Sequence, residues 1–177
     1  DTSNIVSIDH CEKLRTTLGS NNIDMANTAY QNLLKEIEAD ITAFEGTLHQ
    51  DQKIHNAMLV DYIINQKMAY KKDIDIFGKD DVWADPTITA ATMQGDCEDY
   101  ALLKLKVLMD LKIISPGEGY IGYIEDQQEN GHAILVITDS NGKPYVLDNY
   151  EATEETPIEP TATPLEEYQQ ENISTFF

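Results

Sequence analysis

The fold of this chain is decided by residues 95–104, which read Gly95-Asp96-Cys97-Glu98-Asp99-Tyr100-Ala101-Leu102-Leu103-Lys104. This stretch predicts a loop that turns abruptly into a helix, because aspartate, here Asp96, is a favoured N-cap residue. Asp99 stands three residues later, where an acidic side chain completes a capping box. The residues that follow contain neither Gly nor Pro through Lys112, so we expect a helix over residues 97–113.

Cys97 is then the first residue of the predicted helix. Unpaired N–H groups and the positive end of the helix dipole meet at this position, and both stabilise an anion. A thiol there is easier to ionise, and the thiolate is the nucleophilic form. Cys97 is therefore a candidate catalytic nucleophile. The plain alternative is a small buried cysteine near a helix start.

A β-hairpin is predicted further along the chain. One apolar run covers residues 132–138, a second covers residues 145–149, and Asn141-Gly142 between them indicates a tight turn. If the register is symmetric about this turn, His132 and Asp148 lie at roughly paired positions. A histidine can take the thiol proton and a carboxylate can orient its imidazole, so Cys97, His132 and Asp148 form a candidate catalytic triad.

The composition narrows the possible functions. The chain has 177 residues, of which 41% are hydrophobic, which is enough for one domain with a real core. Its net charge of −20 repels phosphate backbones and argues against a nucleic-acid partner. No apolar run approaches the ~18 residues of a membrane-spanning helix, so we expect no transmembrane segment.

The order of elements predicts an α+β fold. Helices come first, then the nucleophile helix, and both pack on a small antiparallel sheet. We expect a single domain over residues 1–177, with a helical part at about 1–113, a sheet part at about 118–150 and an acidic tail at 151–177. The expected helices cover residues 9–18, 25–44, 51–70 and 87–93, and a strand covers 120–124. The tail contains seven Glu and three Pro and is predicted to be mostly extended, wrapped over the domain.

Two carboxylates flank the candidate nucleophile. Asp96 and Glu98 raise the pKa of a neighbouring thiol unless something neutralises them. Ca²⁺ accepts carboxylate oxygens in irregular geometry, so we expect a calcium site here, completed by the Asp-rich connection over residues 71–94. The alternative is that both are ordinary acids at a helix N-terminus. Cys11, the second cysteine, is expected to be free and buried, and His49 and His55 to be structural.

These residues resemble one known family, the bacterial transglutaminase-like cysteine proteinases of the LapG type, which cleave adhesins. The similarity is carried by the block Gly95–Ala101, by the later His132, and by the tripeptide Leu147-Asp148-Asn149. The segment before the nucleophile is also similar, at Asn65, Tyr70, Asp73, Phe77-Gly78, Asp81 and Trp83-Ala84-Asp85-Pro86.

The resemblance implies a papain/transglutaminase-like fold and a periplasmic, calcium-dependent cysteine endopeptidase. Such enzymes cleave a large surface adhesin, release cells from a biofilm, and are inhibited by an inner-membrane cyclic-di-GMP receptor. By match of motif, Cys97 is the nucleophile, His132 the base and Asp148 its orienting carboxylate. Asp96 and Glu98 match the calcium ligands.

The implied reaction is amide hydrolysis through a thioester. The Cys97 backbone N–H is one expected oxyanion donor, and Trp83 and Asn65 are candidates for the second. Three alternatives remain open at this point: a transglutaminase-like acyltransferase, a non-catalytic calcium-binding module of the cell surface, and a protease that does not need calcium.

Overall fold

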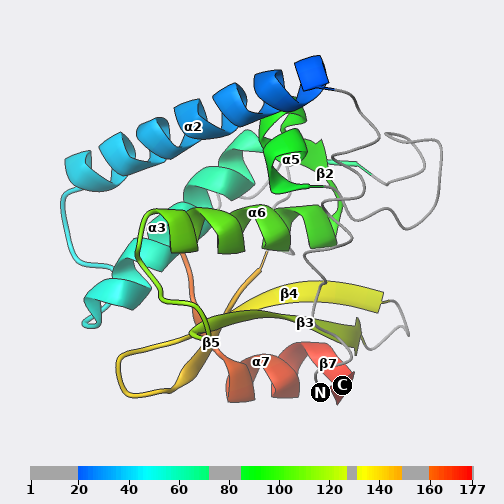
Figure 1. Ribbon diagram of the computed structural model, residues 1–177. Helices are drawn as coiled ribbons and strands as arrows, with labels where there is room; N and C mark the ends of the chain where they lie inside the picture. The colour runs from blue at the N-terminus through cyan, green and yellow to red at the C-terminus, as the bar shows by residue number, and fades with distance from the viewer. Residues whose placement is uncertain (1–19, 72–84, 127–130, 149–159, 177) are drawn as a thin grey trace.

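The computed structural model describes residues 20–71, 85–126, 131–148 and 160–176 (Figure 1). Its helices are α2 (Ser20–Ala43), α3 (Gln52–Lys67), α5 (Pro86–Thr92), α6 (Cys97–Asp110) and α7 (Leu165–Asn172). Its strands are β1 (Ala69–Tyr70), β2 (Gln94–Gly95), β3 (Gly119–Asp126), β4 (Gly131–Thr138), β5 (Pro144–Leu147), β6 (Thr163–Pro164) and β7 (Ile173–Phe176).

An antiparallel sheet of five strands, in the order β6-β5-β4-β3-β7, forms the centre of the described part. Figure 1 shows α3, α5 and α6 on one side of this sheet, α2 outside them, and α7 on the opposite side. Strand β1, after α3, and strand β2, directly before α6, form a separate parallel ladder. The predicted α+β class is confirmed.

Strand β4 is buried on both faces. Ala133, Leu135 and Ile137 belong to the large core between the sheet and the helices, whereas Ile134 and Val136 belong to a second core on the α7 side. Successive side chains of a strand point to opposite faces, so a continuous apolar run is the sequence of a strand covered twice.

The prediction that the C-terminal tail is mostly extended is wrong for residues 165–172, which form α7. Leu165 and Tyr168 are three residues apart, on one side of a helix, and both pack on the second core. This contact stabilises a helix whose other residues are mostly polar. The many glutamates concealed this short apolar stripe in the sequence. Residues 160–164 and 173–176 do contain extended strands, and residues 151–159 lie outside the described part.

Several predicted boundaries also differ. Helix α3 begins after Asp51, whose carboxylate caps the Lys53 N–H, and it ends at Lys67 because the next residues pair with β2. Helix α6 ends at Asp110 rather than at residue 113. Strand β3 covers residues 119–126, beyond the predicted 120–124, because its ends pair with β4 and β7. The predicted helix over residues 9–18 lies outside the described residues.

The β4–β5 connection is wider than the predicted two-residue turn. The Asp139 carboxylate accepts hydrogen bonds from the N–H groups of Asn141 and Lys143, and Gly142 takes a φ of +84° that suits glycine. The register pairs Leu135 with Leu147, so Asp148 lies two positions out of line with His132. The two residues expected at roughly paired positions are therefore diagonal neighbours, and this offset remains within side-chain reach.

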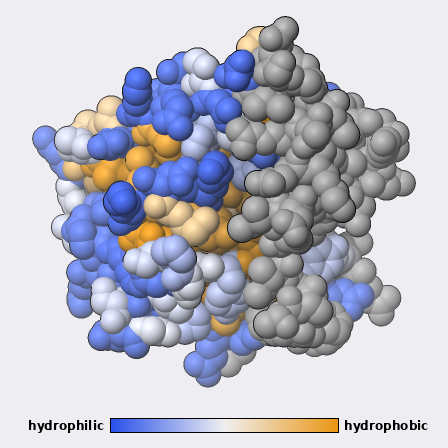
Figure 2. All heavy atoms as spheres, in the orientation of Figure 1, coloured by the Kyte–Doolittle hydropathy of each residue, from blue (hydrophilic) through white to orange (hydrophobic). Residues whose placement is uncertain are grey.

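The coloured part of the face in Figure 2 is largely hydrophilic. Figure 2 shows hydrophobic side chains emerging in patches between helices on one face, among a majority of hydrophilic residues. Among the described residues, no helix is long and apolar enough to span a membrane.

Candidate active site

The first turn of α6 has the capping geometry predicted from its sequence. Asp99 accepts a hydrogen bond from the Asp96 N–H at 3.1 Å, and the two residues form a capping box. Gly95 permits this approach, because a Cβ atom there would lie 2.4 Å from the Cβ of Asp99. The β1–β2 ladder anchors the same loop, since the Lys71 N–H donates to the Gly95 carbonyl. The position of Cys97 is therefore fixed from both sides.

Cys97 is the first residue of α6 and is only 8% exposed. Its sulfur accepts a hydrogen bond from the Ala133 N–H of β4 at 3.4 Å. The same sulfur lies 3.6 Å from a carboxylate oxygen of Glu98, to which the thiol donates. The sulfur is thus hydrogen-bonded to the residue that follows His132 on β4.

The expectation that the helix terminus makes Cys97 easy to ionise is not met in this environment. Burial raises the pKa of the thiol, and the carboxylates of Glu98 and Asp96 raise it further. The hydrogen bond from Ala133 acts in the opposite direction but is outweighed. The like charges of Asp96 and Glu98 are visible in the sequence, but burial, the largest cause of the raised pKa, is a tertiary effect.

His132 and Asp148 meet at the end of the sheet. The Nε2 atom of His132 lies 2.8 Å from Oδ1 of Asp148. Burial raises the pKa of Asp148, but its interactions with His132, Tyr168 and Lys104 outweigh this and hold the pKa below its usual range. Asp148 is therefore an anion suited to orient the imidazole through Nε2.

Two further residues hold Asp148. The Tyr168 hydroxyl of α7 donates to Oδ2, the carboxylate oxygen that does not face His132. The Asn65 side chain of α3 donates to the Asp148 backbone carbonyl at 3.0 Å. Asn65 thus supports the carboxylate, and its suggested oxyanion role stays a prediction. The other oxyanion candidate, Trp83, and the second cysteine, Cys11, lie outside the described residues.

A buried ion pair lies between α6 and α3. The Lys104 ammonium is 2.7 Å from Asp61, and the two side chains are 1% and 5% exposed. Burial raises the pKa of Asp61 to about 6, although Lys104 lowers it. Lys104 also lowers the pKa of Asp148, so the pair belongs electrostatically to the site. Asp61 and Tyr168 were not predicted from the sequence; the available signal for Asp61 was a lysine between two leucines, Leu103-Lys104-Leu105, in the predicted helix.

The chain was compared with known families and solved structures. Residues 28–160 match the family described as bacterial transglutaminase-like cysteine proteinase, BTLCP. The chain belongs to this family. It is accordingly a transglutaminase-like cysteine proteinase, as its nucleophile block suggested. A comparison with curated proteins finds no significant match.

Three solved structures of Legionella pneumophila LapG share the fold. LapG has 20% identity and a TM-score of 0.53, with 93% of this chain and 80% of that chain covered. The EGTA-treated form has 20% identity and a TM-score of 0.54, with 93% of this chain and 77% of that chain covered. The calcium-bound form has 20% identity and a TM-score of 0.53, with 92% of this chain and 78% of that chain covered. The family therefore folds here as it does in LapG.

The residues around the nucleophile fit part of a calcium site. Asp96 and Glu98 supply the hard oxygen ligands that Ca²⁺ prefers, and Glu98 is 7% exposed beside the thiol. Within the described ranges, no group of three or more acidic, His or Cys side chains could hold a metal ion. Asp85, from the Asp-rich connection, instead caps α5 through Thr87. Further ligands would have to come from other residues or from backbone oxygens.

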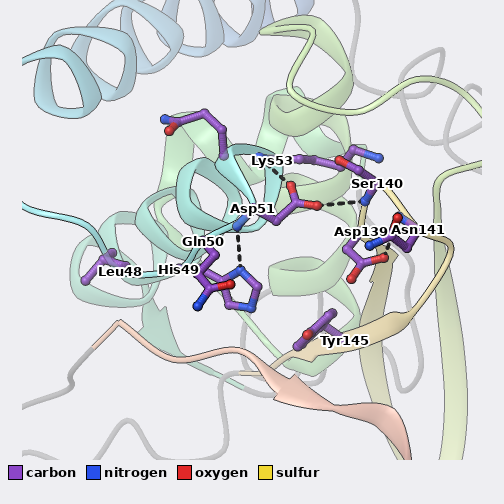
Figure 3. Close-up of a pocket in the computed structure, with 10 residues that line it drawn as sticks. Leu48, His49, Gln50, Asp51, Lys53, Asp139, Ser140, Asn141 and Tyr145 are labelled. Carbon is purple, nitrogen blue, oxygen red and sulfur yellow. Dashed lines mark hydrogen bonds between the residues drawn. The ribbon is translucent and has the colours of Figure 1, made fainter.

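A separate hollow of about 910 Å³ lies between the start of α3 and the β4–β5 loop (Figure 3). None of the three triad candidates lines it. His49, on its wall, accepts the Asp51 N–H at 3.0 Å, and His55 accepts the Leu48 N–H at 3.0 Å. Both histidines therefore fix loop backbone, which confirms their predicted structural role.

Proposed function

We propose that this chain is a calcium-dependent periplasmic cysteine endopeptidase that cleaves a large cell-surface adhesin. In this proposal Cys97 is the nucleophile, His132 the general base and Asp148 its orienting carboxylate. One observation carries the assignment: His132 of β4 bonds to Asp148, which directly follows β5, and the next residue of β4, Ala133, donates its N–H to the Cys97 sulfur. This arrangement brings a buried thiol, an imidazole and a carboxylate to one end of the sheet.

The tautomer of His132 follows from its contact with Asp148. Because Asp148 engages Nε2, that nitrogen carries the proton and Nδ1 is the nitrogen that accepts the proton of the thiol. The Cys97 sulfur accepts a hydrogen bond from Ala133, the residue that follows His132 on β4, so the thiol lies beside the backbone that carries the imidazole. Catalytic hydrogen bonds are often long in structures without substrate and tighten when substrate binds.

The reaction then follows the two steps of nucleophilic catalysis. The Cys97 thiolate attacks the scissile carbonyl carbon, and the Cys97 backbone N–H at the helix start stabilises the oxyanion. Protonated His132 donates its proton to the departing amine, which leaves a thioester. Water activated by the same imidazole hydrolyses the thioester and regenerates the thiol.

Asp96 and Glu98 are the proposed calcium ligands. A calcium ion held there would supply positive charge to compensate both carboxylates, which raise the pKa of Cys97. Glu98 accepts the thiol hydrogen bond in this structure, and coordination of its carboxylate to calcium would weaken its hold on the thiol proton. A calcium-bound LapG structure of the same fold supports this proposal.

The proposed cellular role follows from the family relationship. LapG-type proteinases suggest an adhesin as substrate, the periplasm as the compartment and an inner-membrane cyclic-di-GMP receptor as inhibitor. The strongly acidic composition suits a protein that works with a divalent cation. The substrate assignment rests on this family relationship rather than on a feature of the described site.

The test is cleavage of the N-terminal region of a co-encoded adhesin, with excess calcium or excess EGTA. Wild-type protein is expected to produce a discrete fragment only with calcium, and Cys97→Ala to produce none. Glu98→Gln should need more calcium for the same rate. Glu36→Gln is the matched control, because Glu36 lies on the exposed face of α2.

Other results would contradict specific parts of the proposal. Equal cleavage in EGTA would remove the role of calcium. Incorporation of a labelled amine into a Gln-bearing protein without cleavage would indicate an acyltransferase. An intact fragment pattern with Cys97→Ala would rule out Cys97 as the nucleophile.

A further inference from the structure

Asp148 is held by side chains from three separate elements. Oδ1 faces Nε2 of His132 on β4, and Oδ2 accepts the hydroxyl of Tyr168 on α7. The backbone carbonyl accepts the amide of Asn65 on α3. Each carboxylate oxygen therefore has its own donor, and the second donor comes from the acidic C-terminal segment.

Tyr168 is built into the structure rather than resting on it. Its side chain is 5% exposed and packs in the second core with Ile134, Val136 and Val146. These strand residues hold the ring on the α7 side of the sheet. A buried tyrosine usually keeps a partner for its hydroxyl, and here that partner is the Asp148 carboxylate.

We propose that Tyr168 is a positioning residue of the triad, which locks the Asp148 carboxylate so that Oδ1 stays aligned with His132. This inference rests on the proposed function of Cys97, His132 and Asp148. It makes helix α7 a required part of the active site, although α7 carries none of the reacting atoms.

The physical reason lies in the side-chain torsion of aspartate. The χ2 angle of Asp has a broad, nearly two-fold profile, so a carboxylate with one donor can turn easily. A second donor on the opposite oxygen removes that freedom and keeps the imidazole in one orientation. The Tyr168 hydrogen bond also contributes to holding the pKa of Asp148 below its usual range.

The test compares Tyr168→Phe with Tyr120→Phe. Both variants lose one phenol hydroxyl beside the same core, since Tyr120 also packs against it. The readout is the rate at which iodoacetamide alkylates Cys97 at fixed pH with excess calcium, measured by mass spectrometry of the Cys97 peptide. His132→Ala and Asp148→Asn are measured in parallel.

We expect Tyr168→Phe to slow alkylation of Cys97 by about tenfold, the effect of losing one charge-assisted hydrogen bond. Tyr120→Phe should leave the rate within about twofold of wild type. In addition, ¹³C NMR of the Asp148 side-chain carboxyl should show titration at higher pH in Tyr168→Phe than in Tyr120→Phe. A purely structural role would lower the thermal midpoint without moving this titration.

The outcomes separate the two proposals. If His132→Ala and Asp148→Asn slow alkylation but Tyr168→Phe does not, the role of Tyr168 is refuted and the triad stands. If neither His132→Ala nor Asp148→Asn slows it, the triad fails and the positioning role fails with it. An unchanged Asp148 titration in Tyr168→Phe would also overturn the inference.

Discussion

Replacement of Lys104 by methionine should destabilise the protein far more than an equivalent surface replacement. The Lys104 ammonium lies 2.7 Å from Asp61, and both side chains are almost fully buried. At this distance the gross attraction between the charges is about 6 kcal/mol with an effective dielectric constant of ~20. Because methionine cannot pair with the remaining carboxylate, we expect a loss of about 3–5 kcal/mol in unfolding free energy at pH 8.

The chain contains a matched comparison for this prediction. Lys67 and Glu36 are 2.9 Å apart, nearly the same separation, but their side chains are 36% and 59% exposed. Water and salt screen such a pair, so Lys67→Met should cost no more than about 1 kcal/mol. The difference between the two variants therefore measures burial rather than distance.

The assay is urea unfolding followed by circular dichroism, with Lys104→Met, Asp61→Asn and the double variant. The double variant should be less destabilised than the sum of the single variants, because neither buried charge remains. The cost of Lys104→Met should shrink at pH 5. Burial raises the folded-state pKa of Asp61 above its unfolded value, so acid neutralises the stranded carboxylate in the folded protein. Equal costs for Lys104→Met and Lys67→Met, or additive single effects, would refute the reasoning.

Three further predictions concern the site. Gly95→Ala should lower unfolding free energy by about 1–3 kcal/mol, because the new Cβ would lie 2.4 Å from that of Asp99; a urea midpoint equal to wild type would contradict this. Wild type should be more stable than Asp148→Asn at pH 7, and the gap should close in acid below about pH 4. The lowered pKa of Asp148 contributes stability that is lost as the pH falls through the folded-state pKa. A difference in unfolding free energy that stays constant with pH in urea titrations would contradict this contribution. In EGTA, iodoacetamide should alkylate Cys97 faster in the Glu98→Gln variant than in wild type, because Glu98 raises the pKa of the thiol. Slower alkylation in the variant would contradict this effect of Glu98.

Local chemistry explains what could be predicted around the nucleophile. The capping box of Asp96 and Asp99 is formed by residues three apart, so its signal is contained in the sequence. The start of α6 at Cys97 follows from the same pattern. The hairpin was equally visible because its two apolar runs flank a glycine turn, although the wider loop places Asp148 two positions out of line with His132.

Other parts of the site depend on contacts between distant segments. Tyr168 reaches Asp148 only because α7 packs on the second face of the sheet, and a Glu-rich segment gave no sign of that helix. The partner of Lys104 could not be identified, because nothing local distinguishes Asp61 from other acids. The elevated pKa of Cys97 arises first from burial, which no local pattern reports.

The sequence by itself determined where helix α6 begins and which residue types stand at the candidate site, since caps, turns and residue types act over three or four positions. Only the tertiary structure decided how these groups are tuned. Burial, the two-sided cover of β4 and the convergence of α3, β4 and α7 on Asp148 set the charges and orientations. Such effects depend on which surfaces lose water when the chain folds, and that is a property of the packed molecule as a whole.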